Sequence, residues 1–217
     1  MRIDIWSDIV CPWCYVGKRR FERALAAFEA RDEVQVVHRS FQLDPTRPKG
    51  QTQKRREMLM AKYRLTAAQV DALDARMEQT AAAEGLEYHL TEDGETGNTL
   101  DVHRLLHLAA DRGRQDPALE RFYRAYFTEG RSLFDGASLT ALAVEAGLDE
   151  RDVHDVLAGD SYADAVATDI REAQALGANG VPFFVFDNRF GVSGAQASDV
   201  FSQVLARARE NRVASNR

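Results

Sequence analysis

Residues 7–17 read SDIVCPWCYVG and contain both cysteines of this 217-residue chain, Cys11 and Cys14. Before this stretch, residues 2–6 alternate polar and apolar side chains, which predicts a short β-strand. After Cys14 the apolar residues recur at helical spacing, which predicts a helix to about Ala30. The two cysteines are therefore expected at the point where a strand turns into a helix.

A helix N-terminus changes the chemistry of a thiol placed there. The first backbone N–H groups of a helix have no internal acceptors and carry partial positive charge, so they stabilise an anion. A thiolate at Cys11 would be such an anion, and Pro12 suits the first turn because its missing N–H is harmless there. Cys14 lies one turn further on, within reach of a mixed disulfide on Cys11. The pattern predicts a dithiol that opens and closes.

Two other interpretations of the cysteine pair stay open. Half of a zinc site is disfavoured, because structural zinc needs four ligands and the chain has no second cysteine pair. Its histidines show no ligand spacing beyond the i, i+4 pair His103 and His107. Two inert, buried cysteines are the other alternative. The strand-to-helix context favours redox chemistry, and we expect no metal.

Composition and charge narrow the class of protein. The chain is 45% hydrophobic and 29% charged, as is usual for a globular protein, and its net charge of -6 argues against nucleic acid as a partner. No stretch approaches the length of a membrane span, so no membrane partner is expected. If Met1 is the true start, the absence of a secretory leader predicts a cytoplasmic protein. A transient catalytic disulfide is expected in that reducing compartment rather than a permanent one.

The order of elements follows from the periodicities along the chain. Residues 34–43 are rich in β-branched and aromatic side chains and predict a second strand, which the Pro- and Gly-containing cluster 44–50 ends. Residues 51–177 show helical patterning without a convincing strand. Residues 181–186 and 190–192 then predict a β-hairpin, and a last amphipathic helix follows. Strand, helix and strand at the start predict a parallel βαβ unit.

Three polar or glycine positions mark expected helix ends in the middle of the chain. Thr66 is expected to be the N-cap of a helix that runs to about residue 84, with Gly85 as its stop. Asn98 is expected to be the N-cap of the next helix.

This order predicts an α/β fold with two parts. Residues 1–45 and 178–217 are expected to form one discontinuous domain, in which the βαβ and ββα units share a sheet. Residues 46–177 are expected to form a large helical insertion domain.

The chain resembles the DsbA-like thioredoxin family, and within it a branch of cytoplasmic dithiol oxidoreductases related to the frenolicin-biosynthesis protein. It is also similar to 2-hydroxychromene-2-carboxylate isomerases and kappa-class glutathione transferases. The resemblance implies a thioredoxin-like fold with an all-helical insertion. It rests on matching stretches spread over nearly the whole chain: residues 8–18 (DIVCPWCYVGK), 41–45 (FQLDP), Asn98-Thr99 with His103-Arg104-Leu105, 180–184 (GVPFF) and 192–196 (VSGAQ).

The resemblance implies roles for several residues. Cys11 and Cys14 would be the catalytic thiols, and Pro182, preceded by a cis peptide bond, would face them. The backbone of Val181 would pair with an extended substrate, as an added strand does. A plain edge-strand proline is the alternative for Pro182.

Pro12 and Trp13, between the cysteines, would contact substrate and tune the dithiol. DsbA itself has a histidine where Trp13 stands, so a strongly oxidising potential does not follow. Trp13 is expected to be either an exposed platform beside the reactive sulfur or a packing residue.

The isomerase and transferase relatives usually have serine where Cys11 stands, so Cys11 favours disulfide exchange. Asn98 and His103 match a stretch of that branch and would belong to a substrate pocket, although a helix cap and a polar helix residue are their alternatives. Ser193 and Gly194 could bind a carboxylate through backbone N–H groups, and Ser193 could equally be a plain helix cap.

We therefore predict a protein disulfide oxidoreductase or isomerase whose partners are protein or small-molecule thiols and disulfides. A glutathione-dependent isomerase or transferase acting on a small aromatic substrate is one alternative, with glutathione as co-substrate; otherwise no cofactor is expected. A non-catalytic redox sensor is another. An apolar face of the helical block is compatible both with a homodimer and with burial inside the monomer.

Overall fold

The computed structural model describes residues 1–215 of the chain, which form two compact units. The first contains residues 1–43 and the chain from Thr168 onward, and the second contains residues 44–167. The boundaries expected from sequence were 45/46 and 177/178, so the second boundary lies earlier than expected. The reason lies in α8 (Ala163–Ala175), whose second half is bonded to the sheet of the first unit.

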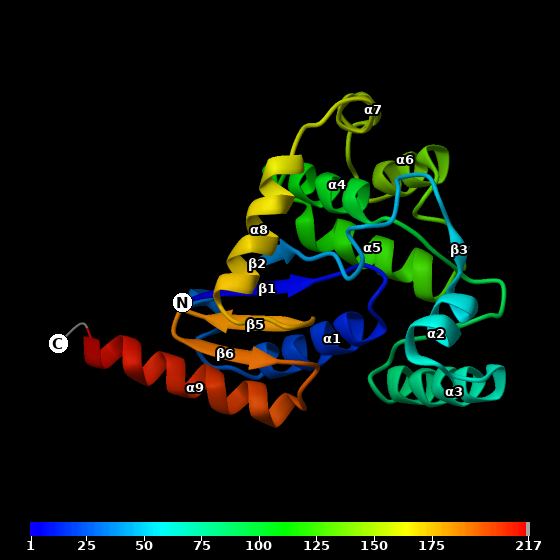
Figure 1. Cartoon of the computed structure of the whole chain (residues 1–217). Coiled ribbons are helices and arrows are strands. Elements are labelled where there is room, and N and C mark those ends of the chain that lie inside the picture. Colours follow the sequence, from blue (N-terminus) through cyan, green and yellow to red (C-terminus); the bar gives the residue numbers. More distant parts are fainter. Residues whose placement is uncertain (216–217) are drawn as a thin grey trace. The chain divides into compact units, whose positions relative to one another are not determined.

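The first unit is built on a four-stranded sheet in the order β2-β1-β5-β6 (Figure 1). β1 pairs in parallel with β2 and antiparallel with β5, and β5 and β6 form the predicted hairpin. Two helices follow strands of this sheet: α1 after β1, and α9 after β6. Their bounds are β1 Arg2–Ser7, α1 Pro12–Ala26, β2 Gln35–Ser40, β5 Phe183–Phe186, β6 Phe190–Ser193 and α9 Ser198–Ser215.

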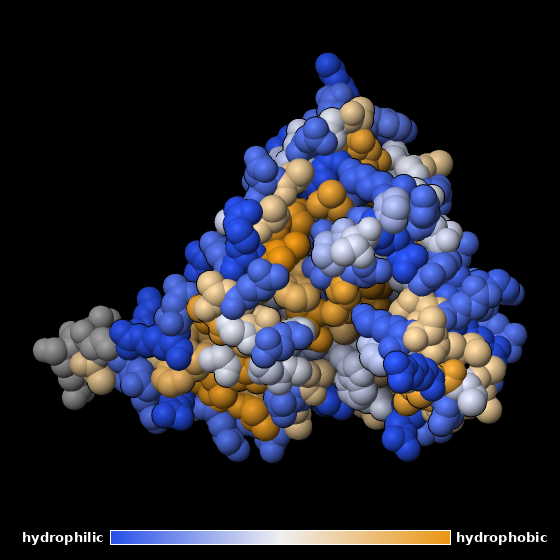
Figure 2. Space-filling model, in the orientation of Figure 1, coloured by the Kyte–Doolittle hydropathy of each residue, from blue (hydrophilic) through white to orange (hydrophobic). Residues whose placement is uncertain are grey.

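Side chains alternate between the two faces of this sheet, and both faces are covered. Ile3 and Ile5 lie on one face, where α1 and α9 contribute aromatic rings to the core. The centroids of Phe21 and Phe201 are 5.7 Å apart, and those of Phe184 and Phe201 are 4.6 Å apart. The apolar stripe of α1, the helix that begins at the two cysteines, therefore fixes this helix on one face of the sheet. The distal part of α9 is mostly hydrophilic, as Figure 2 shows at the left of the view.

On the other face, a buried polar network joins the sheet to α8. The indole Nε1 of Trp6 donates to the carbonyl of Asp169 at 2.8 Å. Arg39 bridges two buried carboxylates: its Nε donates to Asp4 and its Nη1 to Asp169, both at 2.8 Å. Burial opposes the charge of Arg39, but the hydrogen bond to Asp4 and the charge of Asp169 outweigh it, so the pKa of Arg39 is raised.

The second unit is mainly helical. It also contains a two-stranded sheet, β3 (Gln53–Lys54) with β4 (Glu95–Thr96), so the expectation of no strand between residues 51 and 177 was wrong. Strands of two residues are too short to show an alternating pattern in the sequence. Its helices are α2 Arg55–Tyr63, α3 Ala67–Ala83, α4 Leu100–Asp111, α5 Gln115–Phe127, α6 Gly136–Glu145, α7 Glu150–Ala158 and the first part of α8.

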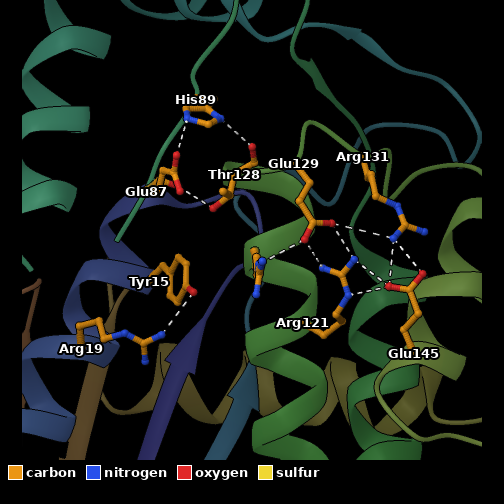
Figure 3. A network of polar contacts seen from close by, with 10 residues as sticks. Tyr15, Arg19, Glu87, His89, Arg121, Thr128, Glu129, Arg131 and Glu145 are labelled. Atoms are coloured by element: carbon orange, nitrogen blue, oxygen red, sulfur yellow. Dashed lines mark hydrogen bonds and ion pairs between the residues drawn. The ribbon is translucent and has the colours of Figure 1, made fainter. Parts of the chain in front are cut away.

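Polar contacts join neighbouring helices of this unit. Arg121 of α5 bonds Glu129 at 2.6 Å and Glu145 of α6 at 2.8 Å, at the centre of the network drawn in Figure 3. The hydrogen bonds from Arg131 and Arg121 lower the pKa of Glu145. Thr66 forms the expected N-cap of α3, with a complete capping box. Among the described residues, no helix has both the length and the apolar character needed to cross a membrane.

Candidate dithiol site

The two cysteines lie at the beginning of α1, as the sequence predicts. Cys11 is the N-cap residue, Pro12 is the first helical residue, and Cys14 lies in the first turn. The backbone N–H of Cys11 donates to the carbonyl of Asp8 at 3.1 Å, and the N–H of Cys14 donates to the carbonyl of Cys11 at 3.0 Å. Both cysteines are free thiols in this structure. The turn from Asp8 to Cys14 therefore places one sulfur at the helix end and the other one turn further on.

The residues of this turn differ sharply in exposure. Cys11 is 6% exposed and Cys14 only 2%, whereas Trp13 between them is 45% exposed. Of the two alternatives for Trp13, the exposed position is the one that the structure shows. Pro12 is half-buried. A reagent or substrate that approaches the start of α1 meets an exposed indole between two buried thiols, of which the Cys14 thiol is the more deeply buried.

The surroundings of Cys14 favour its protonated form. Burial raises the pKa of the Cys14 thiol well above its usual range, and the hydrogen bond to Cys11 and the charge of Cys11 raise this pKa further. The backbone N–H of Asp8 opposes part of this rise, whereas the charge of Asp8 adds to it. At neutral pH Cys14 is therefore a neutral thiol that can donate a hydrogen bond to Cys11.

Asp8 is a site residue that the sequence reasoning did not single out. Its side chain is 1% exposed and accepts a hydrogen bond from the Leu43 N–H at 2.7 Å. This bond ties the turn before Cys11 to the segment that follows β2. The signal in the sequence was an acid three residues before Cys11, but the burial of that acid required the tertiary structure.

The loop before β5 lies against Cys11. The Val181–Pro182 peptide bond is cis, as the resemblance implied. The Cys11 Sγ donates to the carbonyl oxygen of Val181 at 3.6 Å. The Gly194 N–H donates to the carbonyl of Pro182 at 2.8 Å. The fold therefore brings Cys11, Val181, Pro182 and Gly194 together from three separate parts of the sequence.

Ser193 does not occupy the position of a helix cap. It is the last residue of β6, pairs with Phe183 and is exposed, whereas α9 begins only at Ser198. The alternative of a plain helix cap at Ser193 was therefore wrong, because a turn of four residues separates the hairpin from that helix, whereas a role of Ser193 and Gly194 in carboxylate binding stays a prediction. The Ser193 carbonyl accepts a hydrogen bond from the Gln196 side chain at 2.8 Å within this turn.

Asn98 and His103 belong to the other compact unit. Thr99, not Asn98, is the N-cap residue of α4, although Asn98 Oδ1 accepts a hydrogen bond from the Leu100 N–H at 2.8 Å. The Asn98 amide also donates to the Arg47 carbonyl at 2.6 Å, and its side chain lines a cavity of about 150 Å³. His103 is 1% exposed within α4. A role for either residue in substrate binding stays a prediction.

Within the part of the chain that the structure describes, no cluster of three or more His, Cys, Asp or Glu side chains is placed to hold a metal ion.

Comparison with known proteins shows which family and which solved structures this chain is similar to. The family model of the DSBA-like thioredoxin domain matches residues 2–206. The crystal structure of a probable DsbA oxidoreductase from Streptomyces coelicolor is 55% identical, with a TM-score of 0.94 over 97% of this chain and 90% of that one.

Two further solved structures have the same fold at lower identity. The cytosolic disulfide reductase DsbM from Pseudomonas aeruginosa, solved with GSH, is 18% identical, with a TM-score of 0.66 over 96% of this chain and all of that one (100%). A 2-hydroxychromene-2-carboxylate isomerase is 15% identical, with a TM-score of 0.67 over 100% of this chain and 98% of that one. The thioredoxin-like fold and the family resemblance are thereby confirmed.

Proposed function

Because the chain belongs to the DSBA-like thioredoxin domain family, we propose that it is a thiol–disulfide oxidoreductase in which Cys11 and Cys14 exchange a disulfide with the substrate. The observation that carries this proposal is the pair of unequal sulfurs at one helix N-terminus. Cys11 is the N-cap residue and faces the Val181 carbonyl at 3.6 Å, whereas Cys14 is the more deeply buried of the two and is held protonated. A dithiol needs this division between an attacking and a resolving sulfur.

The reaction has two steps. The Cys11 thiolate attacks one sulfur of a substrate disulfide; a new S–S bond forms, the substrate S–S bond breaks, and the leaving sulfur departs as a thiolate that takes up a proton. Cys14 then loses its proton and its sulfur attacks the Cys11 sulfur. The Cys11–Cys14 disulfide forms and the second substrate thiol is released. The substrate gains two electrons, and two external thiol groups, which are oxidised together to a disulfide, restore the dithiol; the same steps in reverse oxidise a dithiol substrate.

The residues around Cys11 supply binding in this proposal. The backbone at Val181, next to Pro182, pairs with an extended segment of the substrate, and the exposed ring of Trp13 with Pro12 contacts the groups that flank the substrate sulfur. The partners are protein or small-molecule thiols and disulfides. We place this activity in the cytoplasm, and support for that location comes from the cytosolic DsbM, which shares the fold.

The test is reduction of insulin disulfides by the wild type, Cys11→Ser and Cys14→Ser, with dithiothreitol as the electron source. We expect turnover by the wild type, none by Cys11→Ser, and accumulation of a mixed disulfide on Cys11 in Cys14→Ser. The mixed disulfide is identified by mass spectrometry before and after reduction. If the wild type is no faster than Cys11→Ser, the proposal is wrong.

A glutathione-dependent isomerase or transferase acting on a small aromatic substrate is the second candidate. It is favoured by the shared fold with 2-hydroxychromene-2-carboxylate isomerase and with DsbM solved with GSH. This candidate requires saturable glutathione binding and activity that survives Cys14→Ser. Titration calorimetry with reduced glutathione separates the two candidates. A titration that shows no saturable binding of glutathione would exclude the isomerase or transferase.

A further inference from the structure

Gly17 lies in the second turn of α1, where glycine is less favourable than alanine. The surroundings of its Cα explain this choice. A Cβ built on Gly17 would lie 3.0 Å from Pro182 Cγ, which is tighter than ordinary packing, and 3.4 Å from Ala195 Cβ, which is at the close limit of ordinary contact. The proline side chain is closed into a ring that fixes φ, so it can only change its pucker and cannot swing to another rotamer. Gly17 therefore lets two loops approach the helix more closely than any other residue would.

The two loops that meet Gly17 are also bonded to each other and to α1. The Gly194 N–H donates to the Pro182 carbonyl at 2.8 Å, which joins the turn after β6 to the loop before β5. Arg20, one turn after Gly17, donates from Nη1 to the Ala195 carbonyl at 2.7 Å. The loops therefore move together if either one is displaced from the helix.

We propose that Gly17 is a positioning residue that sets how closely the Val181–Pro182 loop approaches Cys11, and thereby whether the Val181 backbone can pair with an extended substrate beside the thiol. This inference rests on the function proposed above. Val181 precedes Pro182 directly, so a side chain that pushes the proline away also moves the Val181 carbonyl, now 3.6 Å from Cys11 Sγ. Backbone pairing with a peptide then fails, while the thiols themselves stay in place at the beginning of α1.

The experiment compares Gly17→Ala with Gly136→Ala. Gly136 is the first residue of α6, and a Cβ built there meets nothing within 4 Å, so this variant makes the same change in open space. Two substrates are used: insulin, which must lie along the Val181–Pro182 loop, and 5,5′-dithiobis(2-nitrobenzoic acid), a small disulfide that needs only access to the sulfur. The rate of hydrogen exchange at the Gly194 amide reports whether its hydrogen bond to the Pro182 carbonyl still joins the two loops, and this measurement does not depend on enzyme activity. Arg20→Met, which removes the bond to Ala195, is the second variant if Gly17→Ala does not fold.

For Gly17→Ala we expect the KM for insulin to rise about fivefold or more at nearly unchanged kcat. The rate with the small disulfide should stay within about twofold of the wild type, and the Gly194 amide should exchange about tenfold faster. Gly136→Ala should leave all three unchanged. Unchanged exchange at Gly194, or an equal loss with both substrates, would overturn the inference. A wild type that does not reduce insulin refutes the proposed function instead, and the exchange rate at Gly194 still decides the role of Gly17.

Discussion

The carboxylate of Asp169 joins α8 to the sheet that carries the dithiol, and its removal should destabilise the first unit strongly. Asp169 is 1% exposed and accepts hydrogen bonds from Arg39 Nη1 at 2.8 Å and from the Ser40 N–H at 2.9 Å. Removal of one partner from a buried ion pair costs about 3–5 kcal/mol. Arg39 is 23% exposed and keeps Asp4, so we expect Asp169→Ala to lower the free energy of unfolding by about 3 kcal/mol, the lower end of that range.

Urea unfolding followed by tryptophan fluorescence measures this loss. In a Trp13→Phe background the buried Trp6 is the only tryptophan, and it reports on the first unit. Glu172→Ala is the matched control, because Glu172 lies on the same helix and its Oε2 is 3.8 Å from Arg39 Nη2, but its side chain is 47% exposed. Glu172→Ala should lower the free energy of unfolding by about 0.5 kcal/mol or less. If Asp169→Ala costs no more than Glu172→Ala, the reasoning about the buried network is wrong.

Three further predictions concern other parts of the chain. Because burial and Cys11 raise the pKa of the Cys14 thiol, iodoacetamide at pH 7 should modify Cys11 in the folded protein and both thiols only after denaturation; peptide mapping that finds equal modification would contradict this. The hydrogen bond from Arg131 lowers the pKa of Glu145 below its ordinary value of 4.5, so its contribution to stability is present above pH 4.5 and lost as the pH falls through the lowered pKa. Glu145→Gln should therefore weaken the acid dependence of thermal melting, and an identical pH profile would refute the assignment. Thr66→Ala should cost about 1 kcal/mol in chemical unfolding through loss of the capping box, whereas Thr66→Ser should cost little.

The local signals in the sequence were sufficient for much of the fold. The period of two before Cys11 and the helical period after Cys14 predicted β1, α1 and the place of the thiols between them. The cap at Thr66 was found because its partners lie within one turn of the chain. The cis bond before Pro182 came from the resemblance, since an X-Pro bond alone favours trans.

Contacts between segments that are distant in the sequence could not be predicted from these local patterns. Periodicity does not report that Asp169 turns into the sheet to meet Arg39, and so the boundary between the two units lies earlier than expected. The two-residue strands β3 and β4 have no pattern of their own, because each exists only as a partner of the other.

The sequence by itself determined the order of the elements and the presence of two thiols at a helix N-terminus, because periodicity, caps and turns are encoded within a few neighbouring residues. The tertiary structure alone decided that the Cys14 thiol is more deeply buried than the Cys11 thiol, that Asp8 is buried beside it, and that Gly17 admits Pro182 so closely. Burial and close approach depend on segments that are distant in the sequence, such as those of Gly17 and Pro182, and these meet only when the chain has folded.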